Sequence, residues 1–336
     1  MRKKPVLIAL FLFCGAVWTA IAQPPTWSVK QTFHIGGEGG WDYVTVDAAN
    51  HRLFVTRSTH TQAIDTESGK LIGDIPGQKS AHGVALVPKL NRGFITDGGG
   101  SGAIIVFDLT TYAVLGRLAA LPDADGIIYD PATDLVLAVS GDGNALLAFR
   151  PGIDLKTGSV GAPIKLPGSP EFLAADGAGK AFINLVDKNF VAVVDLKSRQ
   201  VLTQWPVAPG GHPVGMAIDA HKHRLFIGCR NPQKLIVMNT DTGEVQAALP
   251  IGAGVDAAAF IDRQAFASCH DGSLTVIGEK DGKFEVQQVV KTLEGARTMG
   301  GIRGHIYLPT AELEPAATGR PKSKPGTFMI VQVEQR

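Results

Sequence analysis

One short pattern recurs about every 40 residues along the chain, and this repetition limits the possible folds more than any other feature. Each copy has an apolar strand, a turn rich in Asp, Pro or Gly, and a second apolar strand, as in residues 44–47 and 52–55. Seven copies lie 40 to 46 residues apart, starting at Val44, Val84, Ile127, Leu173, Met216, Ala258 and Met299. This period is typical of WD40-like repeats, in which each repeat supplies four strands. The sequence therefore predicts an all-β, seven-bladed β-propeller with four-stranded antiparallel blades.

The second half of each repeat agrees with this fold. Residues 63–71 have the pattern of a strand, a turn with Gly69 at its tight end, and another strand, and residues 193–198 and 237–244 repeat it. The 336 residues include 40 glycines, and 45% of the chain is hydrophobic. A disordered chain would have fewer apolar residues and a coiled coil fewer glycines, so both classes are excluded.

The two ends of the repeat region complement each other. The seventh copy ends with the strand 330–333 and lacks its outermost strand, whereas residues 31–35 resemble 203–207, the last strand of the fourth copy. We therefore expect the N-terminal strand to complete the last blade and close the ring, which removes an exposed sheet edge.

The first 22 residues have the pattern of a secretory signal peptide. Three basic residues at positions 2–4 precede an apolar stretch over 6–18, and Ala20-Ile21-Ala22 is a small-residue cleavage site. We expect cleavage after Ala22, a single domain over 23–336, and a periplasmic or secreted monomer with no membrane span after cleavage. An uncleaved membrane anchor is the alternative.

Charge and cysteine content narrow the possible partners. The whole chain has a formal charge of +1, but residues 1–22 carry three basic and no acidic residues, which leaves 29 basic and 31 acidic residues after cleavage. A general nucleic-acid binder needs a basic excess, so this balance disfavours nucleic acid. Cys229 and Cys269 occupy matching positions in adjacent repeats, too far apart for a disulfide, and we expect two free, partly buried thiols.

Several segments carry a resemblance to a known family. Residues 224–231, 252–260, 295–299 and 305–312 resemble exported YVTN-repeat propellers of the YncE type, and the likeness extends over the whole chain after residue 22. The resemblance implies the propeller fold and no particular catalytic residues. One relative is reported to bind single-stranded DNA, and others in this wide group handle haem-like cofactors or act as lyases and lactonases. Cys269-His270-Asp271-Gly272 stands where the family pattern suggests Asn-Gly-Asp-Gly.

Candidate binding residues cluster where loops enter the innermost strands or join the second and third strands. In a propeller these loops lie on one face and surround the central channel, where we expect a ligand site. The candidates are Trp41, Asp42, Arg57, His82, Asp125, Glu171, His212, Arg230, Asp256, His270 and Arg297.

These residue types are compatible with two kinds of ligand. Arg57, Arg230 and Arg297 could together bind a carboxylate or phosphate through forked hydrogen bonds, or they could pair with neighbouring acids. His82, His212 and His270, with acidic neighbours, are weak candidates for a divalent metal site assembled across blades. Alternatively, these polar residues only cap the ends of strands and bind no ligand. The sequence requires no cofactor. The loop 311–326 is Pro-rich and could cover the channel mouth or have no role.

The function expected from these features is that of a non-enzymatic binding or scaffold propeller, which recognises a small polar molecule or an extracytoplasmic protein at the channel mouth. One alternative is a metal-assisted hydrolase or lyase that uses the same residues. A second alternative, by family analogy, is binding of single-stranded nucleic acid.

Overall fold

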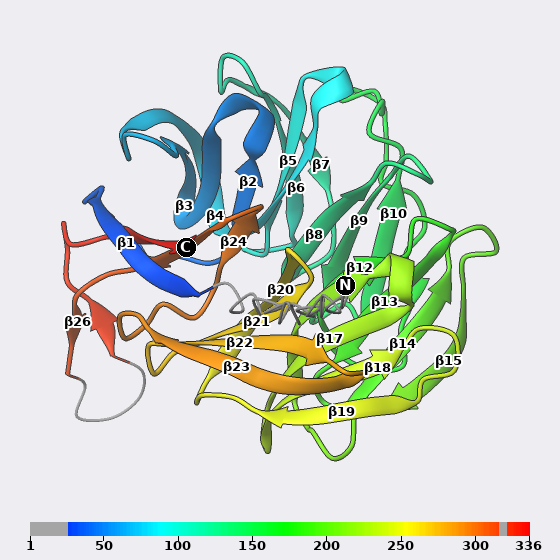
Figure 1. Cartoon of the computed structure of the whole chain (residues 1–336). Coiled ribbons are helices and arrows are strands. Elements are labelled where there is room, and N and C mark those ends of the chain that lie inside the picture. Colours follow the sequence, from blue (N-terminus) through cyan, green and yellow to red (C-terminus); the bar gives the residue numbers. More distant parts are fainter. Residues whose placement is uncertain (1–25, 316–320) are drawn as a thin grey trace, which may run out of the picture.

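The computed structural model describes residues 26–315 and 321–336, which form sheets arranged around a central axis (Figure 1). Among these residues the only helices are three short 3₁₀ turns, Ala48–Asn50, Pro88–Leu90 and Ala220–Lys222. The predicted signal peptide and its cleavage site lie outside the described residues. No helix in the described part of the chain is long and apolar enough to cross a membrane.

Six sheets make up the body of the molecule. The first has six strands, β2 (Val44–Asp47), β3 (Arg52–Asp65), β4 (Leu71–Val87), β5 (Arg92–Asp97), β6 (Ala103–Asp108) and β7 (Val114–Ala119). The second comprises β8 (Ala124–Asp130), β9 (Leu135–Ser140), β10 (Ala145–Phe149) and β11 (Ile164–Lys165). The third comprises β12 (Pro170–Ala175), β13 (Lys180–Leu185), β14 (Phe190–Asp195) and β15 (Gln200–Pro206).

The remaining sheets continue around the axis (Figure 1). The fourth comprises β16 (Pro213–Asp219), β17 (Arg224–Arg230), β18 (Gln233–Asn239) and β19 (Val245–Pro250). The fifth comprises β20 (Val255–Ile261), β21 (Gln264–Cys269), β22 (Ser273–Lys280) and β23 (Lys283–Lys291). The sixth comprises β24 (Gly300–Ile302), β25 (His305–Thr310), β28 (Met329–Gln335) and β1 (Trp27–His34). A separate hairpin joins β26 (Leu313–Glu314) to β27 (Lys322–Ser323).

The all-β propeller predicted from the repeats is confirmed, but the prediction of seven four-stranded blades is wrong. The repeats that begin at Val44 and Val84 share one six-stranded sheet. The reason is that Pro76 and Gly77 do not end the strand: His60 pairs with Pro76 and Ser58 with Ala81, so β4 continues from its pairing with β3 into its pairing with β5. Seven sequence repeats are thus accommodated in six principal sheets.

The predicted mode of ring closure also needs correction. Strands β2, β4, β8, β12, β16, β20 and β24 contact one another in turn, and β24 contacts β2, so these inner strands form a closed circle. The N-terminal strand β1 pairs with β28 at the outer edge of the sixth sheet, remote from this circle. Closure around the axis therefore comes from the contact of β24 with β2 and not from the N-terminal strand.

Local sequence explains the tight hairpins between the outer strands. Asp65 accepts hydrogen bonds from the backbone N–H of Ser68 (2.7 Å) and from its hydroxyl (2.6 Å), and Asn239 makes the same bonds with Thr242 (2.9 and 3.1 Å). The glycine that follows has a positive φ, +69° at Gly69 and +75° at Gly243, which L-residues rarely adopt. These side-chain bonds replace backbone partners in the turn and fix the register of the outer strands.

Apolar side chains between adjacent sheets hold the body together. Leu137, Val139 and Leu146 of the second sheet pack against Ile183 and Ala192 of the third, all fully buried. Equivalent clusters occur between other neighbouring sheets. Each sheet thus buries both faces, and the polar side chains of the inner strands are displaced toward the ends of the strands.

We predict that Trp27 is the main anchor of β1. Its ring is 1% exposed, packs edge-on against Phe266 at 4.9 Å between centroids, and donates a hydrogen bond from Nε1 to Gln264 Oε1 at 2.8 Å. Trp27→Ala should lower the free energy of unfolding by about 3–5 kcal/mol, measured by urea denaturation. The control is Val29→Ala on the same strand, where the side chain is 39% exposed and a loss below about 0.5 kcal/mol is expected. Equal losses for the two variants would contradict the assignment.

Candidate functional site

The candidate residues reach the axis through a backbone irregularity that recurs in the inner strands. The pairing register shifts between Ala81 and Val84 in β4, Ala124 and Ile127 in β8, Pro170 and Leu173 in β12, and Val255 and Ala257 in β20. Each shift contains one candidate, namely His82, Asp125, Glu171 and Asp256. A β-bulge turns a side chain away from the regular alternation of the strand. The repeated bulge therefore gathers titratable groups at one end of the circle.

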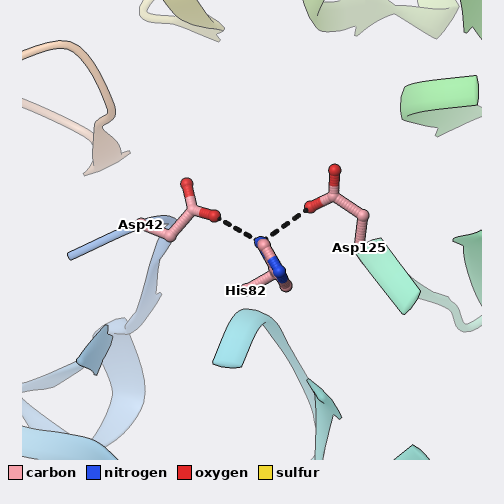
Figure 2. Close-up of side chains that lie close together, drawn as sticks. All are labelled: Asp42, His82 and Asp125. Carbon is pink, nitrogen blue, oxygen red and sulfur yellow. Dashed lines mark hydrogen bonds and ion pairs between the residues drawn. The ribbon is translucent and has the colours of Figure 1, made fainter. Parts of the chain in front are cut away.

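Asp42, His82 and Asp125 form a compact group that we call the channel triad (Figure 2). His82 Nδ1 lies 2.7 Å from Asp42 Oδ2 and 3.4 Å from Asp125 Oδ1, so both carboxylates face the same ring nitrogen. The other ring nitrogen, Nε2, lies 3.1 Å from Ser80 Oγ. The side chains of Asp42, His82 and Asp125 are 21%, 23% and 14% exposed, which leaves each accessible to solvent on one side.

The triad has strongly shifted proton affinities. Burial alone would lower the pKa of His82, but the hydrogen bond to Asp42 and the charges of Asp125 and Asp42 raise it to about 9. Burial raises the pKa of Asp125 well above its usual value and also raises that of Asp42, despite the opposing effect of His82. His82 therefore carries a positive charge at neutral pH.

Glu171 and Tyr43 extend the acidic environment. Burial, together with the charge of Asp256, raises the pKa of Glu171 to about 7. Burial and the nearby charge of Asp125 raise the pKa of Tyr43 well above its usual value. Carboxylates of three inner strands and of the segment before β2 thus share one small region.

A second cluster joins Asp256 to two arginines. Both Arg230 and Arg297 make ion pairs with the Asp256 carboxylate, one to each oxygen. Arg230 Nε also donates to the carbonyl of Val255 at 3.0 Å, and Arg297 Nη2 donates to the carbonyl of Trp41 at 3.3 Å. Two guanidinium groups share one carboxylate, and the charges of Glu171 and Asp42 lie near Arg230 and Arg297 respectively.

A cavity of about 750 Å³ lies over this cluster, and we call it the mouth cavity. Its lining combines aromatic, basic and glycine residues with the hairpin β26–β27, and includes Gly39, Gly40, Trp41, Arg230, Gly254, His270, Arg297, Leu313, Pro321, Lys322 and Ser323. Part of the predicted loop 311–326 therefore borders the cavity, although residues 316–320 of that loop lie outside the described residues. The indole Nε1 of Trp41 is buried and has no hydrogen-bond partner.

Below the clusters, the centre of the circle is nearly filled. A small cavity of about 60 Å³ is lined by side chains of the inner strands and the residues just before them, among them Tyr43, Val84, Ile127, Phe172, Met216 and Met299. Tyr43 and Phe172 pack at 4.8 Å between ring centroids. A molecule in the mouth cavity would thus rest above a narrow, mainly apolar centre.

Arg57 is placed differently from the other candidates. Its side chain is fully buried, donates to the carbonyl oxygens of Gly36, Glu38, Gly39 and Gly40, and stacks 3.6 Å from the centroid of Phe328. Burial lowers its pKa to about 10. Its donors are used to hold the Gly-rich segment before β2. Arg57 therefore does not join Arg230 and Arg297 in one anion site, although the sequence had suggested this grouping.

The three histidines proposed as metal ligands are not assembled together. In the described residues, the group able to hold a metal ion contains His82 with Asp42 and Asp125. His270 lines the mouth cavity instead. His212 has a positive φ of +53°, and burial with the nearby charge of Arg230 lowers its pKa.

Cys229 and Cys269 are free, as expected, but they are fully rather than partly buried. Burial raises the pKa of each thiol to about 12. A thiol with such a pKa is protonated at neutral pH and is a poor nucleophile. This disfavours a catalytic role for Cys269 beside His270.

The sequence did not reveal the partners that complete these clusters. Ser80, which contacts His82, and Lys322, which borders the mouth cavity, were not selected, and neither has a distinctive motif. One usable signal was present: a glycine directly follows His82 and Asp125, and a Cβ at Gly83 or Gly126 would press against the next inner strand. A polar residue before a glycine at this point of the repeat identifies a side chain directed to the axis.

Comparisons with known proteins agree on the fold. No family model matches the sequence, and no curated protein matches it. The structure is similar to the WD40 repeats of RRP9, with a TM-score of 0.77, 9% identity, and coverage of 93% of this chain and 100% of that chain. It is also similar to the hydrazine synthase of Kuenenia stuttgartiensis, with a TM-score of 0.67, 12% identity, and coverage of 82% and 94%. These likenesses show the β-propeller fold alone, and the resemblance to YncE-type proteins stays a prediction.

The raised pKa of Glu171 predicts a specific pH dependence of stability. The folded state holds the Glu171 proton up to about pH 7, whereas the unfolded chain releases it near pH 4.5. The protonated Glu171 side chain therefore adds on the order of 3 kcal/mol to the free energy of unfolding below pH 4.5, and this stabilisation is lost as pH rises to 7. Glu171→Gln should remove this loss, as measured by urea denaturation between pH 4.5 and 7.5.

The matched control for this experiment is Glu285→Gln, which changes an exposed glutamate of β23. It should retain the pH dependence of the unchanged protein. If Glu171→Gln has the same pH profile as Glu285→Gln, the placement of Glu171 in a buried acidic cluster is wrong.

Proposed function

We propose that this protein is a binding propeller that recognises a small anionic molecule, with a carboxylate or phosphate group, in the mouth cavity. The observation that carries the proposal is the sharing of Asp256 by Arg230 and Arg297 at the edge of that cavity. Within these two ion pairs one carboxylate faces two guanidinium charges, while the nearby Asp42 carboxylate pairs with His82. The remaining charge, and the planar guanidinium geometry, suit an oxyanion.

The rest of the lining supports the same ligand chemistry. His270 and Lys322 add polar and cationic groups, and Trp41 offers an aromatic side chain. Arg297 lies 5.8 Å from the centroid of the Trp41 ring, so charge and aromatic surface are adjacent. An anion that also carries an apolar or ring portion would fit this lining best.

The size of the cavity favours a small molecule over a protein partner. Pockets for small molecules usually measure about 300–1,000 Å³, and the mouth cavity has about 750 Å³. The hairpin β26–β27 supplies Leu313, Lys322 and Ser323 to the lining and narrows access. A macromolecular partner would have to contact the rim rather than the interior.

The sequence also bears on where the protein acts and on one of the alternative functions. We propose that binding takes place in the periplasm or outside the cell, which rests on the signal-peptide pattern of residues 1–22. The hydrolase or lyase alternative requires a metal, and the channel triad is the observation that favours it. Nucleic acid has less support, because the chain after residue 22 has more acidic than basic residues.

The proposal predicts binding of at least one small anion that depends on both arginines. Inorganic phosphate, succinate, citrate and benzoate would be titrated into the full chain by isothermal titration calorimetry. Arg230→Gln and Arg297→Gln should each weaken binding by about tenfold or more, because a charge-assisted hydrogen bond contributes roughly 1.5–3 kcal/mol.

The control variant is Arg224→Gln. Arg224 lies at the other end of the strand that carries Arg230 and forms an ion pair with Glu279 at 2.7 Å. The variant therefore loses a comparable ion pair at a site remote from the cavity. Its affinity should equal that of the unchanged protein. Failure of all four anions to bind, or an equal loss in Arg224→Gln, would overturn the proposal.

A further inference from the structure

We propose that the channel triad is a binding site for a divalent transition-metal ion of the zinc, cobalt or manganese class. One donor atom from each of Asp42, His82 and Asp125 lies within 4.8 Å of the other two. Protein ligands of zinc bind at about 2.0–2.2 Å, so neighbouring ligand atoms around one ion stand roughly 3–3.6 Å apart. The separations of 2.7 and 3.4 Å from His82 Nδ1 need only small shifts to meet this geometry.

The first supporting observation is an unsatisfied carboxylate oxygen. His82 Nδ1 can carry one proton, which it shares in a hydrogen bond with Asp42 Oδ2 at 2.7 Å. Asp125 Oδ1 is buried without a hydrogen-bond partner and has only the charge of His82 at 3.4 Å. Leaving a buried acceptor unpaired is costly. A metal ion between the three groups would bind this oxygen directly and would displace the proton from His82 Nδ1, as metal binding to histidine requires.

The second observation is the contact of His82 with Ser80. Metal-binding histidines usually donate their other ring N–H to an oxygen, which fixes the ring and leaves the ligating nitrogen free. Here Nε2 lies 3.1 Å from Ser80 Oγ, and Nδ1 faces both carboxylates (Figure 2). Ser80 therefore has the position of an orienting residue, without being a ligand itself.

The donor set determines the class of metal. One imidazole nitrogen with two carboxylate oxygens suits zinc, cobalt or manganese, whereas calcium and magnesium prefer oxygen ligands alone. Three protein ligands leave at least one coordination position for water or another molecule. The partial exposure of the three side chains gives the ion a path from solvent.

The inference is tested by metal titration of tag-free full chain that has been treated with a chelator and dialysed. Zn²⁺ and Mn²⁺ would be titrated by calorimetry, Co²⁺ by its visible absorption, and Mg²⁺ as the comparison ion. We expect one equivalent of Zn²⁺ or Co²⁺ per chain. Asp125→Asn and His82→Gln should weaken binding by about 100-fold or more, and Ser80→Ala by about 10- to 100-fold.

The matched control is His223→Gln. His223 also forms a His–Asp pair, with Asp241 at 3.1 Å, but both side chains are 58% exposed. This variant should bind one equivalent with unchanged affinity, while Asp125→Asn should retain the circular dichroism spectrum of the folded protein. Absence of stoichiometric binding of Zn²⁺, Co²⁺ and Mn²⁺ would overturn the inference, as would full affinity in a folded Asp125→Asn variant.

Discussion

The close approach of the inner strands is the constraint on which the site depends. Neighbouring inner strands touch at positions where a Cβ would clash, such as Gly83 against Ile127 and Gly215 against Ala257 and Ala258. Because the strands are so close, the centre below the site holds only a small cavity of about 60 Å³. Its lining is mainly apolar, although Thr45 and Asp256 also reach it, and most titratable side chains lie elsewhere. They gather at the end of the circle, where the register shifts in β4, β8, β12 and β20 direct them toward the axis.

The repeat predicted most strands because strand and turn signals are local. The strand predicted over residues 44–47 coincides with β2, the strand predicted from residue 52 begins where β3 begins, and the Asp65 and Asn239 turns form as their sequences indicate. The division into sheets was not predictable in the same way. Pro76-Gly77 has the composition of a turn, but β4 remains paired on both sides of it, which depends on the partners β3 and β5 rather than on the local sequence.

The candidate site was predictable by position but not by pairing. Counting residues before each inner strand selected His82, Asp125, Glu171 and Asp256, because the repeat places equivalent residues at equivalent points. The partners of Asp256 come from positions 26 and 41 residues away, so the ion pairs depend on how the circle closes. Arg57 shows the limit of this reasoning. Its partners are backbone carbonyls of residues 36–40, and a glycine-rich segment gives no side-chain signal that it will bind an arginine.

The two proposed sites are linked through shared charges. The pKa of Asp42, raised first by its burial, is also raised by the charge of Asp256 and lowered by that of Arg297. Arg297 in turn pairs with Asp256 and donates to the carbonyl of Trp41, which directly precedes Asp42. A metal ion at the channel triad would add positive charge close to the arginines and favour an anion in the mouth cavity. By linkage, the bound anion would favour the metal to the same extent. The arrangement of acids near the axis and arginines at the mouth therefore makes each proposed ligand strengthen the binding of the other.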